Sequence, residues 1–156
     1  GREYLLRECL RGVRDLYDHI LIDSPPALGI LTVNAFTASD YVLMPVLSDL
    51  YSLQGLIQLS ETLDEVRKKS NPDLKAAGIL LTRYNPRERI STLIRETSAE
   101  IAQKLGIPLL DTTIRSSVLL TRAQILREDI TKYASKNKAA DDYRRLVEEL
   151  IRREVL

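Results

Sequence analysis

Residues 20–29 read Ile-Leu-Ile-Asp-Ser-Pro-Pro-Ala-Leu-Gly, and this stretch decides the fold class. Its first three residues form a short apolar run that is typical of a buried strand. Asp23 follows at the predicted strand end, and the two prolines and the glycine predict a stiff turn away from the sheet. Open α/β sheets bind ligands at the carboxyl ends of their strands, and phosphoryl-transfer sites use a carboxylate to hold magnesium. A simpler interpretation makes Asp23 a turn or helix-capping residue.

Apolar runs and amphipathic segments alternate along the rest of the chain. We predict further strands at 41–46, 77–82 and 109–114. Helical periodicity fits residues 3–16, 34–39, 52–70, 91–105 with a glycine end at Gly106, and 139–155. This alternation predicts one α/β domain over residues 1–156, with a doubly wound, mostly parallel sheet of about four strands and helices on both faces.

Composition narrows the function only slightly. The 23 Lys and Arg residues balance 22 Asp and Glu residues for a net charge of +1. Residues 115–156 nevertheless hold ten basic and seven acidic side chains, which permits an anionic partner such as DNA but equally describes solvated helix faces. The chain has one cysteine and one histidine, so no intrachain disulfide or Cys/His zinc site is expected. No apolar run approaches ~20 residues, so we expect no membrane span.

One motif is absent. The chain contains no G-x-x-x-x-G-K-[ST] phosphate loop and no other glycine-rich phosphate cradle. Together with Asp23, this absence predicts half of a nucleotide site. The chain also starts without methionine, which suggests a fragment.

Several short motifs occur in an order that points to a known family. They lie at 17–26, 28–29, 31–35, 38–40, 45–46, 53–56, 78–82 and 111–114. With these motifs the chain resembles the carboxyl-terminal half of a ParA/Soj-type partition ATPase, a relative of MinD in the deviant-Walker P-loop class. In that family the phosphate loop and its lysine precede the region present here. The resemblance therefore implies that this piece alone is inactive.

The resemblance also implies cofactors and partners. The family binds ATP with Mg²⁺ and forms a sandwich homodimer that coats DNA without sequence preference. A ParB-like centromere-binding protein stimulates hydrolysis, and the cycle moves plasmid or chromosome cargo. The implied location is the bacterial cytoplasm, on the nucleoid.

The resemblance assigns the phosphate side of the site to the first motif. Asp23 matches the catalytic-site aspartate that holds magnesium through water. Pro25, Pro26 and Gly29 match the loop that senses the γ-phosphate. Asn34 also matches a recurring family position, where we expect it to cap a short helix rather than contact a ligand.

The base side of the site is assigned to two strand ends. Thr82 and Arg83 match the strand end that borders the adenine, and Ile114 and Arg115 match a second wall of that pocket. The family usually has Ile-Pro-Arg-Asn at this second wall, whereas this chain has Ile-Arg-Ser-Ser at 114–117. The missing proline changes the stiffness of the wall, and an arginine could stack on the base instead.

DNA binding is assigned to basic side chains. Arg87 matches one basic residue that the family uses for DNA, whereas a second such position is Leu119 here. Arg89, Arg122 and Arg127 could supply the missing charge, because non-specific binding requires several cations rather than one particular residue.

Two other functions remain open at this stage. The first is a non-enzymatic module that binds DNA or a partner on the same scaffold. The second is a MinD-like ATPase that cycles on membranes through a terminal amphipathic helix. The tail 143–156 balances three glutamates against four arginines, which favours packing on the sheet. We also expect a gap beside strand 20–23, whose unpaired edges favour association with another chain.

Overall fold

The computed structural model describes residues 1–25 and 27–156. The chain divides into two compact units, the first formed by residues 1–42 and 55–76 and the second by residues 43–54 and 77–156. No helix in the described part of the chain is long and apolar enough to cross a membrane.

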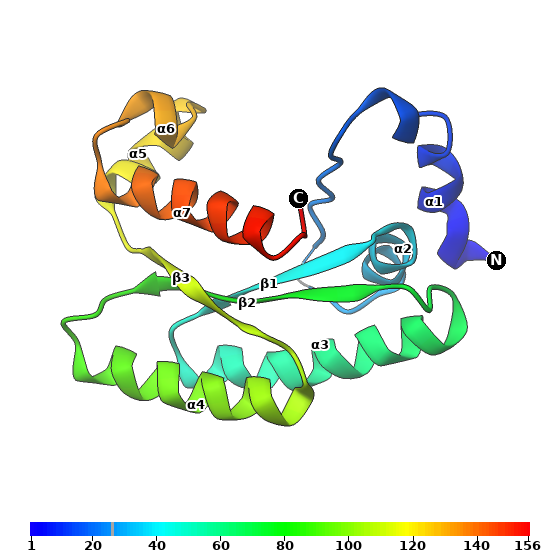
Figure 1. The fold of residues 1–156 in the computed structure, drawn as a ribbon, viewed down its shortest axis with the longest axis horizontal. Helices are drawn as coiled ribbons and strands as arrows, with labels where there is room; N and C mark the ends of the chain where they lie inside the picture. Colours follow the sequence, from blue (N-terminus) through cyan, green and yellow to red (C-terminus); the bar gives the residue numbers. More distant parts are fainter. Residues whose placement is uncertain (26) are drawn as a thin grey trace. The chain divides into compact units, whose positions relative to one another are not determined.

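The first unit contains α1 (Leu5–Leu10), α2 (Ile30–Ala38) and most of α3 (Leu50–Lys69). Helix α1 lies against α2 (Figure 1) and has no buried residue. The predicted helix over 3–16 breaks into α1 and two flanking 3-10 turns. Gly12 lies within this break, where a glycine costs about 1 kcal/mol relative to alanine in a helix. Helix α2 begins at Ile30, four residues before the predicted start.

The predicted strand 20–23 is wrong. Residues 17–25 form neither helix nor strand, and Leu21 is 90% exposed. A strand requires a hydrogen-bonded neighbour, and none of the described residues pairs with this segment in a ladder. The apolar pattern of residues 20–23 therefore indicates a segment suited to burial. It does not show whether a partner strand is present.

The sheet has three strands in the order β1 (Tyr41–Leu47), β2 (Lys75–Tyr84) and β3 (Leu109–Arg115). The β2–β3 pair is parallel, with Leu81 opposite Thr113 and Thr82 opposite Ile114. The parallel α/β class is thus confirmed, with three strands in the described sheet rather than about four.

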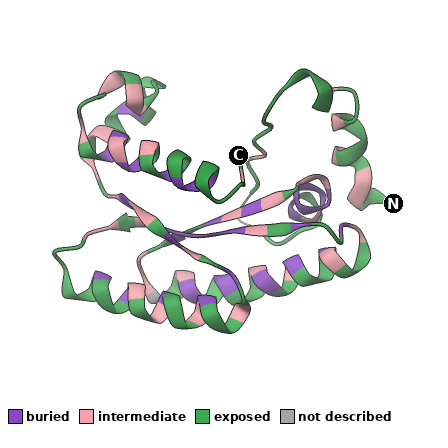
Figure 2. Ribbon diagram, viewed as in Figure 1, coloured by how far each residue is buried: buried purple, intermediate pink, exposed green. Residues whose placement is uncertain are grey.

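Helices of the second unit cover both faces of its sheet. Helix α4 (Arg89–Leu105) lies on one face and α7 (Lys138–Arg152) on the other, while α5 (Val118–Leu126) and α6 (Ile130–Tyr133) connect β3 to α7 (Figure 1). Helix α4 ends as predicted, because Gly106 adopts the left-handed conformation with φ 65°. The core side chains Ile79, Leu81 and Leu110 are fully buried, and buried residues lie both along the strands and on the helices (Figure 2).

Candidate functional site

Asp23 lies in the irregular segment of the first unit. Its side chain is exposed, and it makes no hydrogen bond or ion pair with the described residues. It caps no helix, because the residue preceding α2 is Gly29, so the helix-capping interpretation of Asp23 is wrong. Pro25 is also exposed, whereas Pro26 lies outside the described residues.

The carboxylate of Asp23 fits the magnesium role implied by the resemblance. Mg²⁺ keeps several waters and is usually held by one or two carboxylates together with substrate phosphates. The described residues include no cluster of three or more His, Cys, Asp or Glu that could hold a metal by itself. A single solvent-exposed carboxylate that acts through water requires no such cluster.

Thr82 and Ile114, which were assigned to the base pocket, lie side by side on β2 and β3 of the second unit. The Thr82 hydroxyl donates to the carbonyl of Val46 at 3.1 Å, and the Thr82 carbonyl accepts the backbone N–H of Ser48 at 3.2 Å. Thr82 therefore ties the carboxyl ends of β1 and β2 together. Ile114 is only 4% exposed and serves as part of the core beneath this edge.

Arg83 has an unusual backbone at the same edge. Its φ is 53°, in the left-handed region that few non-glycine residues adopt, and the strand register shifts between Thr82 and Tyr84. Such a conformation costs about 1 kcal/mol or more and is often found at functional sites. The Arg83 side chain is exposed and has no hydrogen-bond or ion-pair partner in the described part of the chain.

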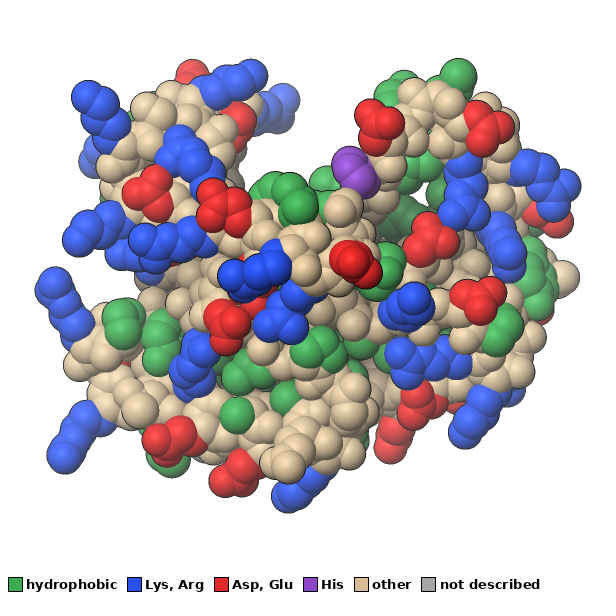
Figure 3. Space-filling model, viewed as in Figure 1, with side chains coloured by type: hydrophobic (Ala, Val, Ile, Leu, Met, Phe, Trp, Pro, Cys, Tyr) green, Lys and Arg blue, Asp and Glu red, His purple; other side chains and the backbone are tan. Residues whose placement is uncertain are grey.

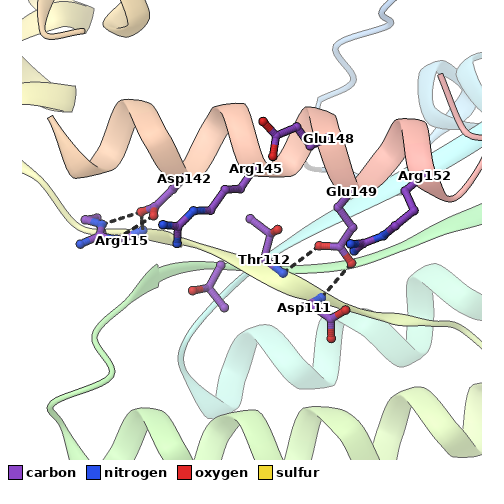
Figure 4. A pocket seen from close by; sticks show the side chains of 9 residues that line it. Asp111, Thr112, Arg115, Asp142, Arg145, Glu148, Glu149 and Arg152 are labelled. Atoms are coloured by element: carbon purple, nitrogen blue, oxygen red, sulfur yellow. Dashed lines mark hydrogen bonds and ion pairs between the residues drawn. The ribbon is translucent and has the colours of Figure 1, made fainter. Parts of the chain in front are cut away.

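Arg115, by contrast, is held by a buried carboxylate. Its Nε and Nη2 donate to Asp142 of α7 at 2.6 and 2.7 Å, and its backbone N–H donates to the same carboxylate at 3.1 Å (Figure 4). The hydrogen bond to Asp142 raises the pKa of the Arg115 guanidinium, although partial burial opposes the shift. Stacking of Arg115 on a base would require this bidentate pair to break.

A second buried acid, Glu149, lies two turns further along α7. Its carboxylate accepts the backbone N–H groups of Asp111 at 2.9 Å and Thr112 at 2.8 Å (Figure 4). It also accepts the Nε–H of Arg153 at 2.9 Å. Burial alone would raise the pKa of Glu149, but hydrogen bonds from Thr112, Asp111 and Arg153 outweigh it and lower the pKa to about 2. Asp142 and Glu149 thus accept three backbone N–H groups of β3.

Sequence reasoning missed both acids. Charged residues on an amphipathic terminal helix usually lie on its solvated face. The available signal was their spacing of seven residues, which places Asp142 and Glu149 on one helical face together with Leu146.

The four arginines assigned to DNA all belong to the second unit and are exposed. Arg87 lies in the turn before α4 and Arg89 is its first residue. Arg122 lies on α5, and Arg127 follows its last residue. None of the four has a side-chain partner among the described residues. Lys and Arg side chains surround the α5–α6 region in the space-filling view (Figure 3).

Several known proteins are similar to this chain over nearly its whole length. A family model described as an AAA domain matches residues 1–76. The chain is 38% identical over 154 residues to the chromosome partitioning protein ParA of Myxococcus xanthus, covering 99% of this chain and 53% of that protein. These matches confirm the resemblance to ParA/Soj-type P-loop ATPases. An uncharacterized protein of Mycobacterium tuberculosis, Rv1708, is 42% identical over 98% of this chain and 47% of its own length.

A solved structure supports the same fold. Cobyrinic acid a,c-diamide synthase from Mycobacterium smegmatis, with bound ADP and magnesium, matches with a TM-score of 0.79 and 30% identity. The match covers 97% of this chain and 54% of that protein. The chain thus spans about half the length of the proteins that it matches.

Proposed function

We propose that this chain is the carboxyl-terminal portion of one ATPase domain that binds ATP and Mg²⁺ and acts in plasmid or chromosome partitioning. The main support is the similarity to ParA over nearly the whole chain. The exposed Asp23, which has no side-chain partner among the described residues, is the carboxylate that the resemblance assigns to magnesium. The solved relative with bound ADP and magnesium is consistent with these cofactors.

In the proposed site each residue has a separate role. Asp23 holds the metal through water, and the metal supplies charge stabilisation to the phosphates when it is bound. Pro25, Pro26 and Gly29 form the loop on the γ-phosphate side. Arg83 is the better candidate for contact with the base than Arg115, because its guanidinium is unpaired whereas that of Arg115 is bound to Asp142.

Partition function further requires association and DNA binding. We propose ATP-dependent homodimerisation, non-specific binding to DNA on the bacterial nucleoid in the cytoplasm, and stimulation by a ParB-like protein. Arg87, Arg89, Arg122 and Arg127 are exposed and have no side-chain partner in the described part of the chain, so they can exchange counterions for DNA phosphates. The chain alone, which has no phosphate loop, should not hydrolyse ATP.

The nucleotide site is tested by binding of a fluorescent ATP analogue. We would measure Mg²⁺-dependent binding to the chain alone and to the intact gene product that contains it. Binding to the intact protein that falls at least tenfold in Asp23→Asn supports the site. The matched control is Asp18→Asn, which removes another exposed acid of the same segment and should leave affinity unchanged. Equal Mg²⁺-dependent affinity for wild type and Asp23→Asn would refute the role of Asp23.

DNA binding is tested by its salt dependence. Each lost phosphate contact should reduce the slope of log affinity against log salt by about one. The double variant Arg122→Ala/Arg127→Ala should lower the slope by about two. Lys68→Ala on α3 removes an exposed charge outside the proposed surface and should not change it.

A non-enzymatic module is the second candidate. It is favoured by the absence of a phosphate loop from the sequence and by the unpaired arginines of the second unit. If the intact protein binds no nucleotide but the chain binds DNA in a salt-dependent manner, this second function replaces the first.

A further inference from the structure

A buried threonine holds the turn that follows the Asp23 segment. The Thr32 hydroxyl, in the first turn of α2, donates to the carbonyl of Ala27 at 2.6 Å. The same carbonyl accepts the backbone N–H of Gly29 at 2.9 Å. Thr32 is only 3% exposed, whereas Ala27 and Gly29 are exposed. The residue preceding α2 is Gly29, which provides no capping side chain, so Thr32 closes this turn from inside the helix.

Two residues further along α2, Asn34 binds the start of the chain. Its Nδ2 donates to the carbonyls of Arg2 at 2.8 Å and Ile30 at 2.9 Å, while its Oδ1 accepts the backbone N–H of Leu6 at 3.1 Å. Asn34 is 7% exposed. It does not cap a short helix as expected from the sequence, but connects the middle of α2 to α1. These three bonds engage both amide hydrogens and the carbonyl oxygen of the side chain.

The opposite end of α2 is anchored differently. Asn71 donates to the carbonyls of Phe36 at 2.9 Å and Ser39 at 2.7 Å, and the hydroxyls of Thr37 and Ser70 lie 2.9 Å apart. These partners are buried or half-buried. The last turn of α2 is therefore fixed to the end of α3, while its first turn is joined to an exposed turn and to a helix with no buried residue.

We propose that Thr32 is a positioning residue that couples the Ala27–Gly29 turn to α1 through α2 and Asn34. Displacement of the turn moves the first half of α2 about its anchored end, and Asn34 transmits the displacement to the backbone at Leu6. The functional part of this inference rests on the proposed function, in which the segment after Asp23 responds to nucleotide. The coupling should appear as a change in the amide exchange rate of Leu6 that depends on the Thr32 hydroxyl.

Amide hydrogen exchange of the 156-residue chain, followed by NMR, tests the coupling directly. Thr32→Val removes the hydroxyl at nearly constant volume, and it should accelerate exchange at both Gly29 and Leu6 by about fivefold or more. Thr32→Ser keeps the donor and should stay within about twofold of wild type. Thr62→Val is the matched control, because Thr62 on α3 also donates to a backbone carbonyl, that of Gln58 at 3.0 Å.

Two results would overturn the coupling. In the first, Thr32→Val accelerates Gly29 and leaves Leu6 unchanged, so the bond acts only locally. In the second, the amides of β2 accelerate as much as Leu6, so the variant merely destabilises the whole chain. Acceleration at Gly29 and Leu6 without β2, absent in Thr32→Ser and Thr62→Val, supports the proposal.

A second arm uses the intact gene product with Mg²⁺ and a non-hydrolysable ATP analogue. The analogue should change Leu6 exchange in wild type and Thr32→Ser but not in Thr32→Val. Bound analogue with no change at Leu6 in wild type would contradict the nucleotide-driven part of the inference. If no analogue binds, the proposed function and the nucleotide-driven part of the inference both fail. The coupling of Gly29 to Leu6 is then decided by the exchange measurements on the 156-residue chain alone.

Discussion

Two segments of this chain have strand-like sequences, but only one forms a strand. Strand β3, Leu109–Arg115, pairs with β2, and its backbone N–H groups also donate hydrogen bonds to carboxylates of α7. The segment 20–23 is just as apolar, but it has no strand partner among the described residues and Leu21 is 90% exposed. An apolar run thus predicts where a strand could form, whereas hydrogen bonds to its backbone decide whether the strand forms.

The edge of β3 shows how an unpaired strand is stabilised without another strand. Glu149 accepts the backbone N–H groups of Asp111 and Thr112, and Asp142 accepts that of Arg115. An exposed edge with free donors invites pairing with another chain. The α7 carboxylates therefore both stabilise this edge and block it, whereas the segment 20–23 has no such protection in the described structure.

The largest expected effect comes from removing the carboxylate that caps two donors. Glu149→Ala leaves the N–H groups of Asp111 and Thr112 without their acceptor and should lower the free energy of unfolding by about 3 kcal/mol. Glu148→Ala, which changes an exposed neighbour with no side-chain partner among the described residues, should cost less than about 0.5 kcal/mol. Urea denaturation measures both. Equal losses for the two variants would mean that the capping bonds do not stabilise β3.

The second effect concerns the bidentate pair at the end of β3. Asp142→Ala leaves the half-buried guanidinium of Arg115 without its partner and should cost about 2 kcal/mol. Asp141→Ala breaks only the exposed pair with Arg144 and should cost less than about 0.5 kcal/mol. Thermal denaturation of both variants provides the comparison, and a loss no larger for Asp142→Ala than for Asp141→Ala would contradict it.

The pH dependence of stability should identify Glu149 separately. Its pKa is lowered from 4.5 to about 2 in the folded chain, so its contribution is present above pH 4.5 and is lost as pH falls toward 2. We expect the free energy of unfolding to decrease across this range, and to decrease less steeply in Glu149→Gln. Parallel pH profiles of the two proteins, measured by urea denaturation, would show that other acids dominate.

The smallest effect is expected in the unpaired segment. Leu21→Ser should change the free energy of unfolding by less than about 0.5 kcal/mol, because the side chain is already in solvent. The matched change in β3, Leu110→Ala, should cost about 3 kcal/mol because Leu110 is fully buried. A loss above about 1.5 kcal/mol for Leu21→Ser would indicate that residues 20–23 are packed in the folded chain.

The sequence predicted the parallel α/β class and the ends of several elements. Gly106 marked the end of α4, and the apolar runs located β1, β2 and β3 to within a few residues. These features depend on local periodicity and backbone preference, which the sequence displays directly.

Features that depend on distant partners were not predictable. The sequence could not show that Asp142 and Glu149 accept hydrogen bonds from β3, because the sequence of a helix does not reveal which distant backbone groups its charged side chains contact. The left-handed backbone of Arg83 likewise follows from the register shift between β2 and β3. Asp23 was placed at the end of a strand that does not form, and its assignment to magnesium rests on family resemblance.

Site-resolved amide hydrogen exchange of the 156-residue chain tests the central comparison most directly. We expect the amides of residues 20–23 to exchange within about tenfold of unfolded-chain rates. The amides of Asp111, Thr112 and Arg115 should exchange only through global unfolding. Protection of residues 20–23 equal to that of β3 would contradict the account, because it would show that this segment already has a strand partner in the chain.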